Sequence, residues 1–222
     1  MLSDALLVAG KDLRVELRSK VVLNQVAPFA AAVLLLFGFA LGPDRAALRP
    51  AAAGLYWVAV LLASLLAVQR SFAIESADGA RDGLRLSGLD PAGIFLGKAA
   101  AVVVQLLILE TLLTAGVAVF YGAHLAGGLV LAAACLLASI GLAAVGTLYG
   151  MASSALRVRE TLLPLLFLPV VAPVLLAATK AWDGALTGPP GSGAGWLAVL
   201  GVFAVVYVAA GIVAFDPLLE DG

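Results

Sequence analysis

Six apolar runs divide this chain, and each is long enough to cross a lipid bilayer as a helix. The hydrocarbon core of a bilayer is about 30 Å thick and needs roughly 20 apolar residues per helix. Because 63% of the residues are hydrophobic and only 12% are charged, an ordinary soluble globule is excluded. We therefore predict an all-α integral membrane protein with six transmembrane helices. The expected spans are 21–41, 51–69, 98–121, 129–149, 161–179 and 196–215.

Residues 1–20 carry too many charges to span the membrane. Their apolar residues recur at three- and four-residue spacing, which places them on one face of a helix. A helix with one apolar stripe and a basic opposite face lies along the membrane surface. We expect an interfacial elbow helix that feeds the first span, with a solvated N-terminal tail as the alternative. The apolar stripe consists of Leu2, Leu6, Ala9, Leu13 and Leu17.

The longest polar interval runs from Arg70 to Lys98 and holds eight charged residues. Apolar runs flank it on both sides, so it is expected to be a loop in water that carries a short charged helix. Its charges pair at i,i+3 spacing, Asp78 with Arg81 and Asp82 with Arg85. A merely solvated loop is the alternative to a docking surface.

The end of this interval carries two boundary signals. Gly88 suits the end of a helix, because a residue without a side chain adopts positive φ cheaply. Asp90 and Pro91 are predicted to be the N-cap and the first residue of the next helix.

The last three spans differ in composition. The fourth is rich in Ala, Gly, Ser and Thr, which lets helices approach closely, so it is expected inside the bundle. The fifth contains three prolines, which remove backbone hydrogen bonds and are expected to kink or break the helix. Its freed carbonyls need partners in the bundle or along a wet cavity. The sequence leaves open whether residues 180–195 re-enter the membrane. The three prolines are Pro164, Pro169 and Pro173.

Glu110 is the one acidic residue deep in a span. An intramembrane carboxylate is costly and usually faces protein or water. One interpretation is a cavity or proton-sensitive site, and the other is a neutral residue bonded to Gln105, Thr111, Thr114 or the backbone. Among the remaining polar and aromatic residues, Cys135 is expected to be a packing residue within the bundle. Tyr56 and Trp57 are expected near the outer interface.

Basic residues in short loops set the orientation of a membrane protein. Three of them lie on one side of the predicted bundle: Arg45, Arg49 and Lys180. The other ten lie on the opposite side, which places both termini, the acidic tail 216–222 and the polar interval in the cytoplasm. Those ten are Lys11, Arg14, Arg18, Lys20, Arg70, Arg81, Arg85, Lys98, Arg157 and Arg159.

The run from Gly54 to Lys98 closely resembles the haem exporter protein B family (CcmB), the permease subunit of the cytochrome c maturation ABC transporter. That family has a Trp-Val-Ala/Leu-Leu-x-Ser-Leu-Leu-Ala span followed by Arg and Phe. An Asp-Gly and an acidic residue come next, and a Lys opens the following helix. The matching residues here are Trp57, Ser64, Arg70, Phe72, Asp78, Gly79, Asp82 and Lys98.

Two further segments carry the resemblance. Residues 162–177 are similar to the family's Leu-Pro-x-x-x-Pro fifth helix through Pro169 and Pro173, and DLRVELRSK resembles its acidic-arginine elbow. The chain departs from the family at three places. It has Asp82 where Glu is usual, Val102–Val103 where His-Trp is frequent, and Arg159–Glu160 where Gly-Gly is common. We therefore assign no haem contact to the third span.

The resemblance implies an ABC-2-type exporter permease, in which the helix between spans two and three couples to a separate ATPase. The coupling residues would be Asp78, Gly79, Arg81, Asp82 and Arg85, and the prolines of the fifth span would line the translocation path. The partners would be an ABC ATPase dimer that binds the ATP, a haem-handling membrane subunit and a second copy of this chain. The location would be the bacterial inner membrane.

Haem would be cargo for this chain rather than a resident cofactor. His124, the only histidine, is a weak candidate haem contact at the outer turn, and no metal site is expected. The chain has no GxxxxGK[ST] motif, so it is not expected to be an enzyme or to hydrolyse ATP itself. Two other functions remain open: an ABC-2 permease for a lipid or drug, and an assembly scaffold that transports nothing.

Overall fold

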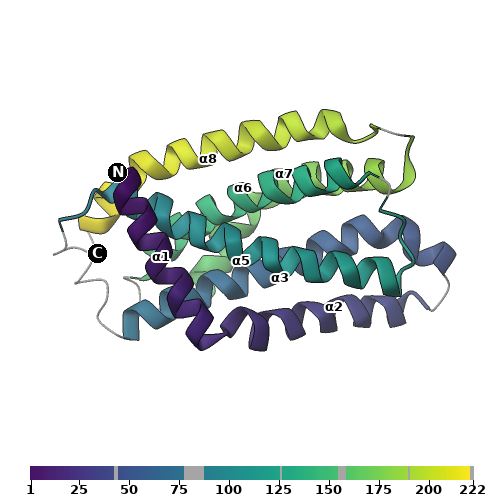
Figure 1. Cartoon of the computed structure of the whole chain (residues 1–222), viewed down its shortest axis with the longest axis horizontal. Coiled ribbons are helices and arrows are strands. Elements are labelled where there is room, and N and C mark those ends of the chain that lie inside the picture. The colour runs from purple at the N-terminus through teal and green to yellow at the C-terminus, as the bar shows by residue number, and fades with distance from the viewer. Residues whose placement is uncertain (43–44, 78–87, 126, 155–158, 190, 221–222) are drawn as a thin grey trace.

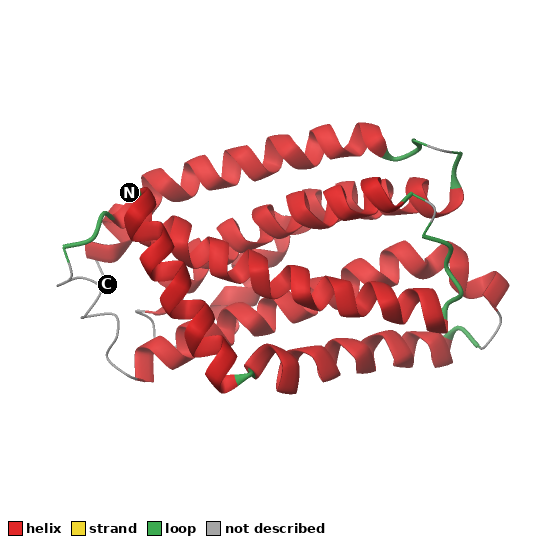
Figure 2. Ribbon diagram, in the orientation of Figure 1, coloured by secondary structure: helices red, strands yellow, loops and turns green. Residues whose placement is uncertain are grey.

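The computed structural model of this protein describes residues 1–42, 45–77, 88–125, 127–154, 159–189 and 191–220. These residues form helices and connections, without strands (Figure 2). The helical elements in chain order are α1 (Leu2–Ser19), the π-helical segment η1 (Val22–Val26), α2 (Ala27–Ala40), α3 (Arg45–Ala77), α5 (Pro91–Phe120), α6 (Gly128–Ser154), α7 (Arg159–Thr187) and α8 (Ala194–Glu220).

Six helical stretches in the described part of the chain are long and apolar enough to cross a membrane. They run side by side along the long axis of the molecule, while α1 lies across one end of the bundle (Figure 1). The predicted all-α membrane fold with six spans is confirmed. The six stretches are Val22–Ala40, Leu48–Arg70, Pro91–Phe120, Gly128–Ala152, Leu165–Thr187 and Ala194–Leu218.

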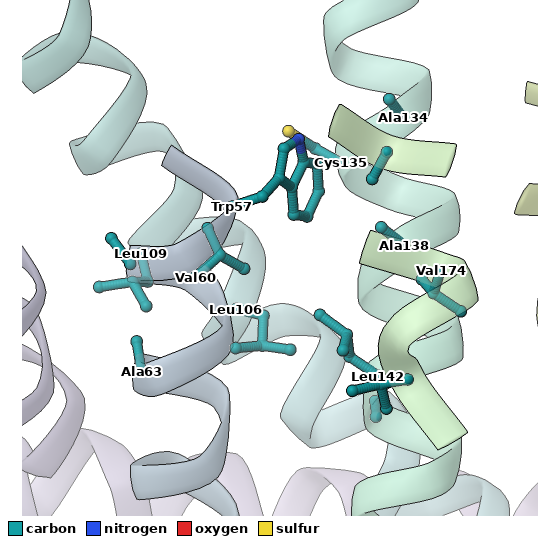
Figure 3. Close-up of a cluster of buried hydrophobic side chains, with 14 of the residues drawn as sticks. Trp57, Val60, Ala63, Leu106, Leu109, Ala134, Cys135, Ala138, Leu142 and Val174 are labelled. Atoms are coloured by element: carbon teal, nitrogen blue, oxygen red, sulfur yellow. The ribbon is translucent and has the colours of Figure 1, made fainter. Parts of the chain in front are cut away.

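Helix α6 lies at the centre of the bundle and packs against α3, α5, α7 and α8. Its small residues allow the close approach, since a Cβ on Gly146 would lie 2.6 Å from the side chain of Val68 on α3. Figure 3 shows this core, where Trp57 of α3 reaches toward Cys135 of α6 above a layer of aliphatic side chains. The expectation that the fourth span lies inside the bundle is confirmed.

The polar interval is shorter in the structure than the sequence suggested. Helix α3 continues past Arg70 to Ala77, and α5 begins at Pro91. Lys98 is therefore two turns inside α5, where its side chain is only 3% exposed. The two boundary signals are confirmed: Gly88 has a φ of 67°, and Asp90 is the N-cap of α5, with Pro91 as its first residue.

Helix α7 is longer than predicted, because residues 180–187 continue it instead of forming a connection. The Gly and Pro content of residues 180–195 suggested a connection, yet one face of residues 180–187 is apolar and buried through Ala181, Trp182 and Ala185. The turn that follows folds back tightly on the helix. A Cβ on Gly184 would lie 2.7 Å from the backbone nitrogen of Gly193, so both positions require glycine.

A π-helical turn joins α1 to α2. Pro28 has no backbone N–H to donate to the carbonyl of residue 24, and the Ala27 N–H instead bonds to the carbonyl of Val22, five residues back. The Glu16 carboxylate accepts a hydrogen bond from the Val22 N–H at 2.7 Å. The chain thereby turns from the direction of α1 into the bundle within a few residues.

Candidate functional site

Helix α1 rests directly on the first two turns of α5. Gly93 and Gly97 make the contact possible, because a Cβ on Gly97 would lie 2.6 Å from the carbonyl oxygen of Ala5 and 2.7 Å from Cβ of Val8. A Cβ on Gly93 would lie 2.9 Å from Cβ of Asp4. Two glycines four residues apart form the small-residue spacing that lets helix backbones touch in membranes. We call this contact the elbow junction.

Charged side chains hold the elbow junction together. The Lys98 ammonium lies 3.6 Å from the Asp12 carboxylate of α1, which also pairs with Lys11 at 3.0 Å. The Asp90 carboxylate accepts a hydrogen bond from the Ala92 N–H at 3.0 Å and so caps α5. The backbone N–H of Asp90 donates to the Asp4 carboxylate at 3.4 Å. The start of α5 and the elbow helix are therefore bound as one unit.

The amino group of Met1 adds to this cluster at 3.1 Å from Asp4 and 3.5 Å from Asp90. The hydrogen bond from the Met1 amino group holds the pKa of the Asp4 carboxyl below its usual value. The hydrogen bond from the Ser3 hydroxyl lowers this pKa as well. The bond from Met1 to Asp4 also raises the pKa of the Met1 amino group.

The exposed apolar side chains of α1 point away from α5. Leu2, Leu6 and Leu17, which the sequence placed on one apolar stripe, are each about three-quarters exposed at 74%, 75% and 74%. The face that packs on α5 instead centres on Val8, the buried residue of this helix. The outward stripe suits a helix that lies at a membrane surface with its leucines toward lipid.

The predicted coupling residues Asp78, Gly79, Arg81, Asp82 and Arg85 lie outside the described residues. The structure describes what flanks them on each side. Helix α3 leads into the interval, and α5 leaves it with the elbow helix attached. The interval is therefore joined to two spans and to the helix at the end of the bundle.

Glu110 lies near the middle of the bundle, on the face of α5 that meets α6. Its side chain is 2% exposed. One carboxyl oxygen accepts a hydrogen bond from the Ser139 hydroxyl of α6 at 2.9 Å, and the Cys135 thiol of α6 is the second neighbour of the carboxyl group. Oε2 is buried without a hydrogen bond of good geometry in the described part of the chain. The Thr114 hydroxyl donates to the Glu110 backbone carbonyl at 2.7 Å rather than to the Glu110 carboxyl group.

Three aromatic side chains from two helices pack together beside this acid. Tyr56 of α3 stacks on Trp182 of α7 with ring centroids 3.8 Å apart, and Trp57 meets both rings edge to face. The Tyr56 hydroxyl donates to the Glu110 backbone carbonyl at 3.3 Å and lies 3.4 Å from the Cys135 sulfur. Among the described residues, the indole nitrogen of Trp57 is buried without a hydrogen-bond partner, whereas that of Trp182 is directed at the Cys135 sulfur.

A cavity of about 320 Å³ leads to this cluster between α5 and α6. Exposed residues line its mouth, and Glu110, Cys135 and Trp182 line its buried end. The mouth residues include Thr111 of α5 and Ala132 of α6. We call this cavity, with the acid at its buried end, the Glu110 pocket.

The Glu110 pocket corrects two expectations. Tyr56 and Trp57 are 0% and 1% exposed, so they belong to the core rather than to an interfacial belt. The side-chain partner of Glu110 is Ser139, rather than Gln105, Thr111 or Thr114. No local pattern marks Ser139 or Trp182, since each comes from another helix and meets the acid only in the folded bundle.

The proline-rich helix α7 is continuous past Pro169 and Pro173. Tyr207 of α8 donates its hydroxyl to the carbonyl of Val170 at 2.6 Å. Pro173 frees the carbonyl of Pro169, four residues before it. The Tyr207 bond therefore ties α8 to this stretch but does not replace the bond that Pro173 removes. His124 is exposed in the connection between α5 and α6. Within the described residues, no group of His, Cys, Asp and Glu side chains could hold a metal ion.

These features define an all-α membrane protein of the six-span permease type, with an elbow helix docked on its third span. A sequence model of the CcmB protein family matches residues 3–220, and the chain belongs to that family. It is 31% identical to heme exporter protein B of Pseudomonas aeruginosa over 93% of this chain and 95% of that protein. The heme exporter protein B of Haemophilus influenzae is 29% identical over 89% of each chain. That of Paracoccus denitrificans is 32% identical over 77% of this chain and 78% of its own.

Proposed function

We propose that this chain is the membrane permease subunit of an ABC transporter for cytochrome c maturation. ATP hydrolysis in a partner subunit is coupled through it to haem export, or to release of a haem-loaded chaperone. The observation that carries the proposal is the match to the CcmB family over almost the whole chain. The geometry of the elbow junction supplies a physical route for the coupling.

The elbow junction connects the polar interval to the rest of the molecule. Asp90 ends the interval and caps α5, and its N–H also bonds to Asp4 of the elbow helix. A force applied to residues 78–87 therefore displaces α5 and α1 together. A bundle changes between two packings only if a ligand binds them unequally, and a nucleotide-driven ATPase dimer docked on this interval provides that difference.

The assembly that follows from this function has two copies of this chain, an ABC ATPase dimer and a haem-handling membrane subunit. The interval and both termini lie in the cytoplasm of a bacterial cell, with the chain in the inner membrane. The ends of the described helices support this arrangement, since the elbow helix, the end of α3 and the end of α8 lie at one end of the bundle (Figure 1).

Reversing two charges of the interval tests the coupling. We expect the double variant Asp78→Lys, Asp82→Lys to lose the ATPase on co-purification and to lose cytochrome c formation in a host that lacks its own heme exporter protein B. The spans should remain folded, because both residues lie outside them. The control reverses the same charge at two other positions outside the predicted spans, Asp44→Lys and Asp221→Lys. Normal cytochrome c formation by the first variant would contradict the docking assignment.

Two other functions make different predictions. A permease for a lipid or drug would show ATP hydrolysis stimulated by that cargo in the reconstituted complex, with no response to haem. An assembly scaffold would bind the same partners, but no cargo would move across vesicles. Co-purification of the intact complex, followed by transport assays with haem, separates all three.

A further inference from the structure

The Glu110 pocket has the composition of a ligand site rather than of a packing defect. Small-molecule sites are mostly apolar cavities with a few converging polar groups, and at about 320 Å³ this one lies at the small end of their size range. Its walls are aliphatic and aromatic, and a single carboxyl group lies at its buried end. The size suits one ring or a short chain with a polar head.

The carboxyl group is incompletely satisfied. Ser139 occupies one oxygen at 2.9 Å, and the Cys135 thiol is a second neighbour of the carboxyl group. Oε2 has no hydrogen bond of good geometry in the described residues. A buried carboxylate is expensive unless it is paired, and none of the ion pairs in the described chain includes Glu110. A thiol is only a weak donor, so the site lacks a strong hydrogen-bond donor, best of all one with a positive charge.

The aromatic residues favour the same chemistry. Trp182 lines the pocket beside the acid and is stacked on Tyr56. Aromatic faces attract cations, and the attraction increases where water is excluded. An acid together with an indole in one apolar pocket matches a protonated amine better than an anion or a neutral hydrocarbon.

The entrance to the pocket indicates the rest of the ligand. Its mouth lies between the exposed faces of α5 and α6, at Thr111 and Ala132, on the side of a membrane helix bundle. A ligand that enters there comes from the lipid phase or its boundary, so its body is apolar.

We propose that the Glu110 pocket binds an amphiphile that carries a protonated amine, with the ammonium group paired with the Glu110 carboxyl group and the apolar body lying along α5 and α6. The site does not depend on the ATPase or on haem. Its ligand reaches the chain from the bilayer.

Binding is measured by isothermal titration calorimetry on the full chain in phosphatidylcholine nanodiscs, whose lipid has no net charge and no N–H donor, with 2-phenylethylammonium as the probe. The comparison ligand is 2-phenylethanol, which has a similar shape and a hydrogen-bond donor but no charge. We expect tighter binding of the ammonium. In Glu110→Gln, which still accepts from Ser139, its Kd should rise by about tenfold to a hundredfold because a charge-assisted hydrogen bond is lost. The Kd of the alcohol should change little.

A second pair of variants tests the pocket without touching the acid. Ala132→Phe fills the mouth and should abolish binding of both probes. Ala209→Phe adds the same ring at an exposed position of α8, which does not line the pocket, and should leave both affinities unchanged. Equal affinity of the native chain for the two probes, or an unchanged ammonium Kd in Glu110→Gln, would overturn the proposal.

The natural amine has two sources, the headgroup of an aminophospholipid or a free amphiphilic amine. Nanodiscs that contain phosphatidylethanolamine separate them. Weaker apparent binding of the probe there supports the proposal with the lipid as occupant. Unchanged binding supports it with a free amine as occupant.

Discussion

Lys98 shows how one residue takes on a different role once the chain is folded. In the sequence it closes a charged interval, and in the structure it is almost completely buried beside Asp12 of the elbow helix. Removing one partner of a buried ion pair is strongly destabilising, even where the pair itself adds little to stability. Lys98 therefore makes the start of α5 dependent on the presence of α1.

This dependence predicts an energetic coupling between Lys98 and Asp12. We expect Lys98→Met and Asp12→Asn each to lower the thermal midpoint of the purified chain. The double variant should lose less than the sum, with a coupling free energy of about 0.5–3 kcal/mol. Thermal unfolding followed by circular dichroism gives the three values. Lys180→Met, at an exposed position of α7, is the control and should change little. Strict additivity would contradict a direct contact.

At the scale of helices, the elbow junction depends on two glycines of α5, Gly93 and Gly97, that lie directly against α1. A leucine at Gly97 has no space beside the Ala5 carbonyl and Val8, so α1 must move away from α5. A leucine at Gly201 of α8 meets nothing within 4 Å of its Cβ and serves as the matched control.

Limited proteolysis with trypsin measures whether α1 is docked. Arg14 and Arg18 are exposed on this helix, and cleavage there requires local opening. Overpacking costs about 1–3 kcal/mol, so Gly97→Leu should speed cleavage at these sites by about fivefold or more, whereas Gly201→Leu should match the native chain. Equal rates in both variants would mean that α1 is held by something other than this contact.

The sequence predicted the helical stretches that are apolar all round. It predicted poorly the stretch of α7 that is helical because only one of its faces is buried. All six spans were found from apolar length, and Asp90–Pro91 marked the start of α5 correctly. Residues 180–187 were missed because the interval 180–195 is rich in Gly and Pro, which is typical of a connection. Their buried face is visible only once α3 and α6 lie beside it.

That extension of α7 is also what creates the Glu110 pocket. Trp182 belongs to it and stacks on Tyr56, and both lie beside an acid on a third helix. Glu110 itself could be singled out from the sequence because acids are rare in spans. Its partners could not, because contacts between distant helices leave no local periodicity to detect.

The two ends of the molecule differ in the elements that they carry. The elbow helix and both termini lie at one end, and the short connection from α5 to α6 with exposed His124 lies at the other (Figure 1). A force applied at the first end reaches the spans through the elbow junction. The Glu110 pocket opens closer to the second end, since Leu125 and Gly128 also line it.

The proposed coupling requires the first end to face the cytoplasm, and single cysteines test this. The native Cys135 is buried and gives a low background with a membrane-impermeant maleimide. We expect His124→Cys to react in intact spheroplasts, and Ser19→Cys to react only after the membrane is opened, because both positions are exposed but at opposite ends. The reverse pattern would place the polar interval outside the cell, where no ATP-driven partner could act on it, and coupling through residues 78–87 would fail.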